Sequence, residues 1–210
     1  AEMAKGRPDL KQLVGTSLTP IVWIWARTVL SPNPAFAKVP VPLASTFMLS
    51  KKIGKESYVE PVIEGSHYRF AVRVGRPTNG DEVKNGTKLA RGANFKCLLS
   101  GAPIEGDYIK KEGREGRMGA RMMAVLVEAE SGRVYLPVTE DMERNALGIV
   151  PPWKPDVPLA PDPRALWTPP YGLRTVGDLF THRQLLALTT FADLVEEARQ
   201  DAEKAALAAR

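Results

Sequence analysis

The stretch Ile21-Val-Trp-Ile-Trp-Ala-Arg-Thr-Val-Leu30 decides the fold class of this chain. β-Branched and aromatic residues dominate the stretch, and they favour the pleated, half-buried surface of a β-strand. Pro20 precedes the run and Ser31-Pro-Asn-Pro34 follows it, so residues typical of turns bound it on both sides. We therefore predict that the folded body begins with a long strand.

Further strands are predicted along the following hundred residues. The ranges 58–64 and 68–74 flank a Gly65-Ser66 pair, which predicts a β-hairpin. A second hairpin is predicted within residues 120–138, where an apolar run is followed by a Ser-Gly turn. The sequence thus predicts an antiparallel, β-rich body over residues 21–147, preceded by an N-terminal extension over residues 1–20.

The C-terminal third of the chain has a different composition. Eight of the 18 prolines lie within residues 148–170, which predicts an extended strap. This strap is either a flexible linker or a segment lying on a surface, and Trp153, Leu159, Leu166 and Trp167 favour the second alternative. Over residues 171–210 we predict a helical segment. Its long helix starts at Thr181-His-Arg-Gln184, a capping box. With short helices in the body, the predicted fold class is α+β.

Composition excludes several classes of protein. With one cysteine and two histidines in 210 residues, the chain has no intramolecular disulfide and no self-contained cysteine-rich zinc site. No run of 18 apolar residues is present, so we expect no membrane contact, and the N-terminus lacks the apolar region of a secretory signal. We expect a cytoplasmic protein.

The net charge of +5 is concentrated in one window. From Lys84 to Arg121 nine bases stand against four acids. Gly-rich backbone and arginines in the stretch 110–121 would suit phosphate binding. The stretch is either a DNA-contacting surface or a solvated charged loop with internal charge pairs, and the sequence leaves both open. The candidate nucleic-acid-binding residues are Lys110, Lys111, Arg114, Arg117 and Arg121.

Several segments, taken in order, resemble one protein family. They are similar to the middle segment of bacterial adenine-specific DNA methylases that carry a zinc-ribbon insert, and the resemblance runs from about Trp23 to Arg199. The segments are Trp25-Ala-Arg-Thr-Val29, Ser31-Pro-Asn-Pro-Ala-Phe36, Leu49-Ser-Lys-Lys52, Gly116-Arg-Met-Gly-Ala-Arg121, Gly132-Arg-Val-Tyr-Leu-Pro137 and the stretch 177–195.

The resemblance implies a zinc ribbon that has lost its ligands. The family's two cysteine pairs fall here on Ser31 and Phe36 and on Cys97 and Ser100. Structural zinc needs four soft or imidazole ligands, and only Cys97 is one. We therefore expect a degenerate ribbon-like hairpin without metal, in which Phe36 fills the former metal position and Cys97 is buried.

The family's catalytic motifs are not visible in this chain. It has no Gly-rich loop for S-adenosylmethionine, so no cofactor is expected unless a separate catalytic methylase chain supplies it. Thr168-Pro-Pro-Tyr171 resembles the catalytic tetrapeptide, but threonine lacks the carbonyl or carboxylate that holds the adenine amine. We expect a structural turn there and no catalytic residues.

Three functions remain open at this point. The resemblance favours a non-catalytic accessory or remnant segment of an adenine-specific DNA methylase that contributes DNA contact or target recognition. The alternative is a protein–protein interaction domain, in which the strap and the C-terminal helix dock a partner. A minor alternative is an S-adenosylmethionine-dependent DNA adenine methyltransferase that acts through Thr168–Tyr171.

Overall fold

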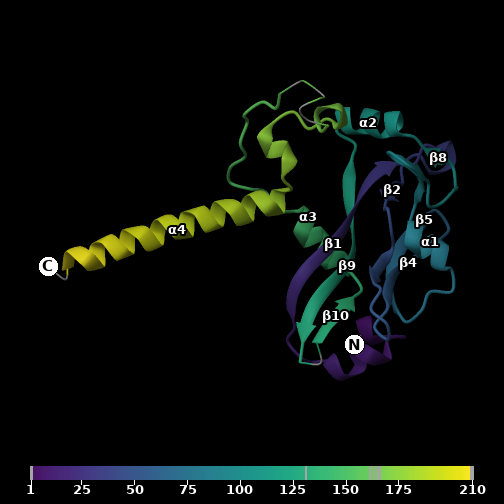
Figure 1. The fold of residues 1–210 in the computed structure, drawn as a ribbon, viewed down its shortest axis with the longest axis horizontal. Coiled ribbons are helices and arrows are strands. Elements are labelled where there is room, and N and C mark those ends of the chain that lie inside the picture. Colours follow the sequence, from purple (N-terminus) through teal and green to yellow (C-terminus); the bar gives the residue numbers. More distant parts are fainter. Residues whose placement is uncertain (1, 131, 161, 163, 165–166, 209–210) are drawn as a thin grey trace. The chain divides into compact units, whose positions relative to one another are not determined.

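The computed structural model describes residues 2–208 apart from 131, 161, 163, 165 and 166 (Figure 1). The chain divides into two compact units, residues 1–140 and 141–210. Antiparallel sheets make up most of the first unit and helices most of the second, so the α+β class is confirmed. The division between the units falls at Glu140, before the boundary at 147 that the sequence suggested.

The largest sheet, sheet A, has the strand order β10-β9-β1-β2. All of its neighbouring strands are antiparallel, and Trp23 of β1 lies opposite Val125 of β9. Prolines cannot donate to a ladder, and the two prolines of β2 lie in a strand at the sheet's edge. The strands are β1 (Thr19–Leu30), β2 (Pro40–Leu43), β9 (Gly119–Ala129) and β10 (Gly132–Leu136).

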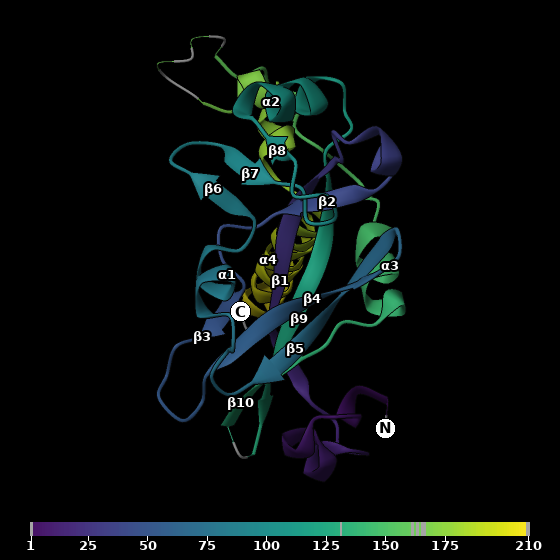
Figure 2. The same ribbon diagram turned by 90° about the vertical axis from the view of Figure 1, so that its right-hand side faces the viewer.

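A second sheet, sheet B, crosses sheet A (Figure 2). It consists of β3 (Met48–Ser50), β4 (Ser57–Glu64) and β5 (His67–Val74) in that order. Gly65 turns β4 into β5 with φ of 65°, a backbone conformation that glycine adopts without a steric cost. The hairpin predicted around Gly65-Ser66 is thus present.

The core of the first unit lies between sheets A and B. Ala26, Met123 and Ala124 of sheet A pack in one cluster with Val59 and Phe70 of sheet B. The cluster also holds Tyr68, whose ring meets that of Phe70 edge to face at 5.4 Å. Tyr68, Phe70 and Val72, which alternate along β5, are buried, whereas Val74 at the end of the strand is 49% exposed.

The third sheet joins the body to a helix. It is formed by β6 (Lys88–Ala90), β7 (Asn94–Lys96) and β8 (Pro103–Ile104), and α2 (Gly106–Arg114) follows it. The buried hydroxyl of Thr87 donates to Pro42 O over 2.9 Å and accepts from Ala44 N over 3.0 Å. These bonds fix the start of β6 against the chain that follows β2.

Short helices occupy the remaining connections of the first unit. They are η1 (Glu2–Ala4), η2 (Pro8–Leu13), η3 (Pro34–Phe36) and α1 (Gly80–Asn85). The sequence did not predict the helix α1, whose Val83 is buried in the core cluster.

The second unit contains the strap and the C-terminal helix. Its helices are α3 (Glu140–Leu147), η4 (Pro169–Tyr171), η5 (Val176–Leu179) and α4 (His182–Ala208). Before α4, the Thr181 N–H donates to the Gln184 side chain over 2.8 Å and the Gln184 N–H donates to the Thr181 hydroxyl over 3.3 Å. The predicted capping box is therefore formed. Among the residues that the structure describes, no helix is long and apolar enough to cross a membrane.

The strap is tied to the segment that precedes α4. Leu159 N donates to Arg174 O and Val176 N donates to Val157 O, both over 2.8 Å. The ammonium of Lys154 lies 2.6 Å from the Asp178 carboxylate. Four residues of the predicted strap, Pro161, Pro163, Ala165 and Leu166, lie outside the described residues.

Candidate functional site

The helix α2 carries the first part of the predicted basic stretch. It buries Ile109 and Glu112 on one face, and the Tyr108 hydroxyl donates to Leu30 O over 3.1 Å, which fixes the helix beside the end of β1. Lys111 and Arg114 project from its last turn into solvent. These two cations are therefore presented by a helix that the core holds in place.

Lys110 lies on the same helix but is engaged by a neighbour. Its ammonium donates to the Asp107 carboxylate over 2.9 Å. This hydrogen bond, together with the charge of Lys110, holds the pKa of Asp107 below its usual value. The pair is one of the internal charge pairs that the sequence left open.

Arg117 is held by two acidic residues. Its Nε donates to both carboxylate oxygens of Glu112 over 3.1 and 3.2 Å, and its Nη2 forms ion pairs with Glu112 and Glu115. Glu112 is only 2% exposed, so its charge needs such a partner. Hydrogen bonding to Glu112 raises the pKa of Arg117 above its ordinary value. Arg117 thus stabilises the end of α2.

Arg121 lies on β9 and is half-buried. Its guanidinium carbon lies 5.2 Å from the centroid of the Tyr68 ring, a cation–π arrangement. Of the five residues predicted to bind nucleic acid, three therefore contact groups of their own chain. Lys111 and Arg114 are exposed.

The structure brings together three of the four positions that the resemblance aligned with zinc ligands. The Ser31 hydroxyl lies 3.3 Å from the Cys97 thiol, and both residues are buried at 3% and 1% exposure. Burial raises the pKa of Cys97, but hydrogen bonds from the Ser100 and Ser31 hydroxyls outweigh it, so that the pKa lies below its ordinary value. The predicted burial of Cys97 is confirmed, and the contacts around its sulfur are polar.

Each serine of this cluster also closes a tight turn. The Ser31 hydroxyl accepts the Asn33 N–H over 3.2 Å, and the Ser100 hydroxyl accepts the Ala102 N–H over 3.4 Å. In the second turn Cys97 N donates to Ala102 O over 2.7 Å. Two loops, far apart in sequence, therefore present hydroxyl and thiol groups to one buried point.

Neither Phe36 nor the two histidines, His67 and His182, belongs to a metal-binding cluster in the described residues. Phe36 is half-buried at the end of η3, and whether its ring fills the former metal position stays a prediction. His67 is exposed beside Ser66, and His182 Nδ1 lies 3.0 Å from Ile149 O. In the part of the chain that the structure describes, no three Cys, His, Asp or Glu side chains gather to hold a metal ion.

Thr168-Pro-Pro-Tyr171 forms a single turn of 3-10 helix. Tyr171 N donates to Thr168 O over 2.9 Å, and Gly172 ends the turn with φ of 85°. The Thr168 hydroxyl is buried and has no hydrogen-bond partner among the described residues. A closed turn of this kind agrees with the structural role that we expected.

Two features of the first unit were not found from the sequence. One is an open cavity of about 350 Å³ beside Cys97, lined by Phe47, Val59, Val83, Asn79 and Lys96 among others. The other is the loop between β3 and β4, which carries Lys51, Lys52 and Lys55. The sequence analysis included Lys51 and Lys52 only as part of a motif and did not single out Lys55, because a charge count does not reveal which cations lack acidic neighbours.

Comparison with known proteins found no matching family model, no matching curated protein and no matching solved structure.

Proposed function

We propose that this chain is a non-catalytic accessory or remnant segment of an adenine-specific DNA methylase, and that it contacts DNA. One observation carries the proposal. Ser31, Cys97 and Ser100, which the resemblance aligned with ribbon cysteines, converge on one buried point from two tight turns. The contact between Ser31 and Cys97, 66 residues apart in sequence, is what a ribbon's arrangement of the two turns would produce, and it supports the proposal.

In this proposal hydrogen bonds replace the metal. A zinc ion holds two knuckles together through four ligands, whereas here the Cys97 thiol is hydrogen-bonded by the Ser31 and Ser100 hydroxyls. The scaffold keeps its geometry without metal, and Lys111 and Arg114 on the nearby α2 face solvent. Exposed cations on a fixed helix suit sequence-independent contact with phosphates.

Methyl transfer would belong to a separate catalytic methylase chain. That chain would supply the S-adenosylmethionine site and the tetrapeptide that holds the flipped adenine. In this chain Thr168 has a hydroxyl where the family has a carbonyl or carboxylate, which disfavours the alternative of an independent methyltransferase. A cytoplasmic location suits a DNA-contacting chain whose only cysteine is a free buried thiol.

DNA binding is tested by fluorescence anisotropy with a labelled duplex at increasing salt. Affinity is expected to fall with a slope of roughly 0.9 per phosphate contact on logarithmic axes. The double variant Lys111→Ala, Arg114→Ala is a better probe of DNA contact than a change at Arg117. Arg117 neutralises the buried Glu112, so changing it would also affect stability. Absence of salt-dependent binding by the wild-type chain would contradict the proposal.

Cofactor binding is tested separately by isothermal titration with S-adenosylmethionine. The chain alone is expected to release no heat of binding. Micromolar affinity would instead support the alternative of an independent methyltransferase.

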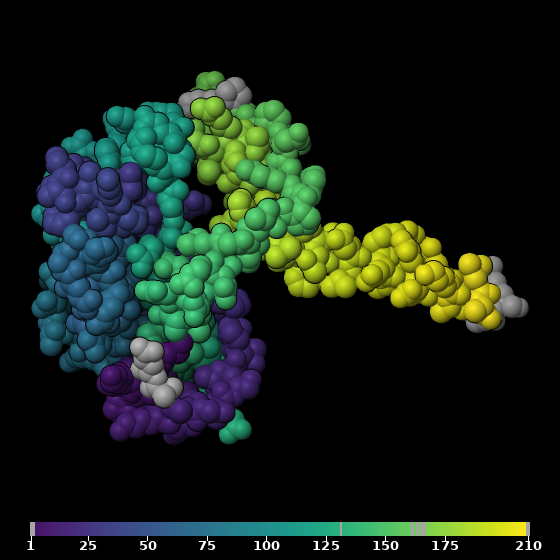
Figure 3. Space-filling model, turned by 180° about the vertical axis from the view of Figure 1, so that it is seen from behind, coloured from purple at the N-terminus to yellow at the C-terminus, as the bar shows by residue number. Residues whose placement is uncertain are grey.

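A second candidate function, protein–protein interaction, is favoured by one observation on α4. Leu188, Phe191 and Val195 lie on one side of the helix at spacings of three and four residues, and they are 53%, 67% and 70% exposed. The side chains of α4 form a continuous surface along the helix (Figure 3, yellow). Such an apolar row is typical of helices that dock into a groove. The triple change of these residues to Ser should abolish association with a partner chain and leave DNA binding unchanged.

A further inference from the structure

The loop between β3 and β4 carries a group of cations outside the stretch that the sequence singled out. It runs from Lys51 to Glu56 and extends from the ends of the two strands (Figure 2). Lys51, Lys52 and Lys55 are all exposed. In the described part of the chain none of the three has an ion-pair partner, in contrast to Lys110 and Arg117 of the predicted stretch.

The tip of this loop is a defined turn. Lys55 N donates to Lys52 O over 2.8 Å, which closes a four-residue β-turn. Gly54 occupies the third position with φ of 76°, as a type II turn requires. Ile53 occupies the second position and is 93% exposed, so the turn holds an aliphatic side chain out in solvent between lysines.

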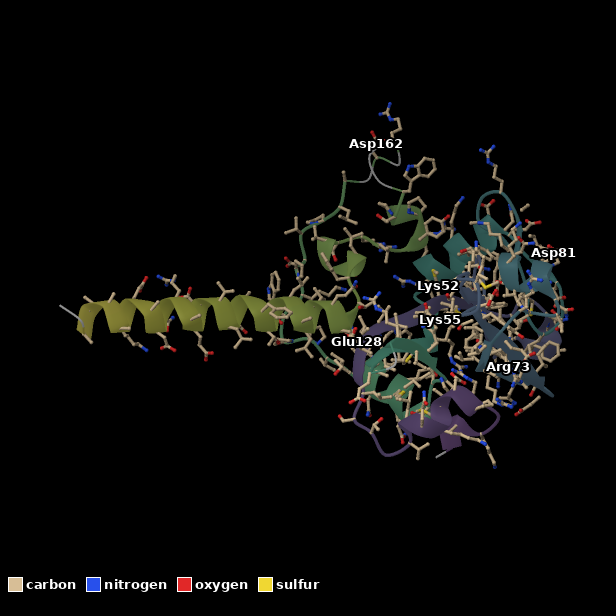
Figure 4. The ribbon with its side chains drawn as sticks, turned by 60° about the horizontal axis from the view of Figure 1, so that its bottom comes forward. Lys52, Lys55, Arg73, Asp81, Glu128 and Asp162 are labelled. Carbon is tan, nitrogen blue, oxygen red and sulfur yellow. The ribbon has the colours of Figure 1, made fainter. Side chains whose placement is uncertain are left out.

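Neighbouring strands extend this basic end of sheet B. Because the sheet is antiparallel, the end of β3, the start of β4 and the end of β5 lie side by side, with Ser57 paired to both Ser50 and Val74. Gly75 N donates to Glu56 O over 2.8 Å, which brings exposed Arg76 to the same edge. Figure 4 labels Lys52 and Lys55 at this loop, together with Arg73 of β5.

The charges at this end of the sheet are not cancelled. Four cations, Lys51, Lys52, Lys55 and Arg76, stand against the half-buried Glu56. Arg73 is already paired with Glu60 at 2.6 Å. Three adjacent strand ends, about 4.8 Å apart, spread the free cations over about 10 Å. Each strand of duplex DNA carries a charge about every 3.4 Å of the helix axis, so this span faces several phosphates.

We propose that the β3–β4 loop is the principal DNA-binding element of this chain, with its lysines on backbone phosphates and Ile53 inserted as a wedge from the minor groove. The proposal rests on the proposed function and names the surface that performs it. Proteins that bend DNA insert single apolar side chains between base steps while cations hold the flanking phosphates. An anionic membrane is the other possible ligand, but a membrane-binding segment presents a broad apolar face, whereas this loop presents one isoleucine.

The first experiment compares the full chain with three variants in duplex binding by anisotropy. The loop variant is Lys51→Ala, Lys52→Ala, Lys55→Ala. The α2 variant is Lys111→Ala, Arg114→Ala. The control variant Lys5→Ala, Lys11→Ala, Lys38→Ala removes the same charge from exposed positions elsewhere.

We expect the loop variant to lose roughly 0.9 of salt slope for each lost contact. Its affinity at moderate salt should fall at least tenfold below that of the control variant, and the α2 variant should lose less. Equal binding by the loop variant and the control variant overturns this inference and leaves the proposed function standing. Failure of the wild-type chain to bind DNA at low salt overturns both. Loop-dependent binding to phosphatidylserine vesicles, with no loop-dependent binding to DNA, overturns the assignment to DNA.

The second experiment tests the wedge through DNA shape. A duplex with a donor and an acceptor dye at its ends reports bending as increased energy transfer on binding. Ile53→Ser should abolish that increase with an unchanged salt slope, and Ile53→Leu should keep it. Equal bending by wild type and Ile53→Ser overturns the wedge. Because Ile53 is exposed, loss of folding is not expected in either variant, and circular dichroism verifies this.

Discussion

The hydroxyl of Ser31 lies 3.3 Å from the thiol of Cys97, although 66 residues separate them in sequence. Ser31 follows directly on β1, and Cys97 follows directly on β7, so the contact joins the largest sheet to the small third sheet. Both residues are buried, which strengthens the hydrogen bond between them relative to one in water. The contact holds the two turns together at the point where the resemblance implied a metal.

If the proposed relationship to the zinc-ribbon family holds, introducing cysteines at the aligned positions should create a zinc site. The variant Ser31→Cys, Phe36→Cys, Ser100→Cys would, together with Cys97, have four cysteines at the positions that the resemblance aligned with the ribbon's ligands, which is the ligand set of a structural zinc site. We expect one equivalent of zinc, measured by mass spectrometry under non-denaturing conditions. At zinc concentrations 100 times the Kd, the metal should add about 2.7 kcal/mol to the free energy of unfolding.

The same prediction has a built-in control. The variant Ser31→Cys, Ser100→Cys keeps Phe36 and therefore supplies three thiolates, so its zinc affinity should be weaker. If the four-cysteine variant folds and still binds no zinc, the two turns do not have a ribbon's geometry, and the degenerate ribbon is refuted.

Although Arg117 lies in the predicted basic stretch, we expect its ion pair with Glu112 to contribute to the stability of the fold. Glu112→Gln keeps the shape of the side chain but removes the charge that binds the guanidinium. Because Arg117 is 40% exposed and can be solvated, we expect a loss of only about 1 kcal/mol in unfolding by urea. Asp107→Asn, which breaks a pair between more exposed groups, is the matched control and should cost less.

The sequence predicted the elements whose signals are local. The Gly65-Ser66 turn identified the hairpin that contains β5, and Thr181 with Gln184 identified the start of α4, because both patterns depend on residues only a few positions apart. The short helix α1 was missed, since the loop-forming residues before Gly80 concealed a helix that the burial of Val83 stabilises.

The sequence did not show which of the predicted basic residues have partners in their own chain. From the sequence alone nothing distinguishes the five basic residues Lys110, Lys111, Arg114, Arg117 and Arg121. In the structure the buried Glu112 engages Arg117, and the Tyr68 ring engages Arg121. Those partners are fixed by tertiary packing, which a charge count does not contain. The gathering of Ser31, Cys97 and Ser100 was predicted only through the resemblance, because nothing in their spacing demands it.

The core between sheets A and B should depend strongly on Phe70. Its ring is 7% exposed and contacts Tyr68 and Phe47 across the cluster, with centroid distances of 5.4 and 6.4 Å. Phe70→Ala removes this volume and should cost about 3 kcal/mol or more. Val74→Ala, on the same strand but half exposed, should cost about 0.5 kcal/mol or less. Similar losses for the two variants in urea unfolding would contradict the assignment of the core.

The second unit should be sensitive to acid through Asp178. Its carboxylate accepts hydrogen bonds from the Lys154 ammonium over 2.6 Å and from the Thr175 and Arg174 N–H groups over 2.8 Å each. Chiefly through the bond from Lys154, and against an opposing effect of burial, these contacts hold the pKa of Asp178 well below its usual value. An unfolded aspartate titrates near pH 3.9, so Asp178 stabilises the folded unit above about pH 4. That contribution is lost as the pH falls below this value towards the lower folded pKa.

Hydrogen exchange of the amides in residues 174–179 measures this directly. At neutral pH, Asp178→Asn should exchange faster than wild type, by the several-fold that corresponds to a lost cap of about 1 kcal/mol. Between about pH 5 and pH 3 wild-type protection, corrected for intrinsic exchange, should fall towards that of the variant. Asp162→Asn breaks only the exposed pair with Arg164 and should leave these amides unchanged. If wild type and Asp178→Asn show the same protection at every pH, Asp178 does not fix the end of the strap.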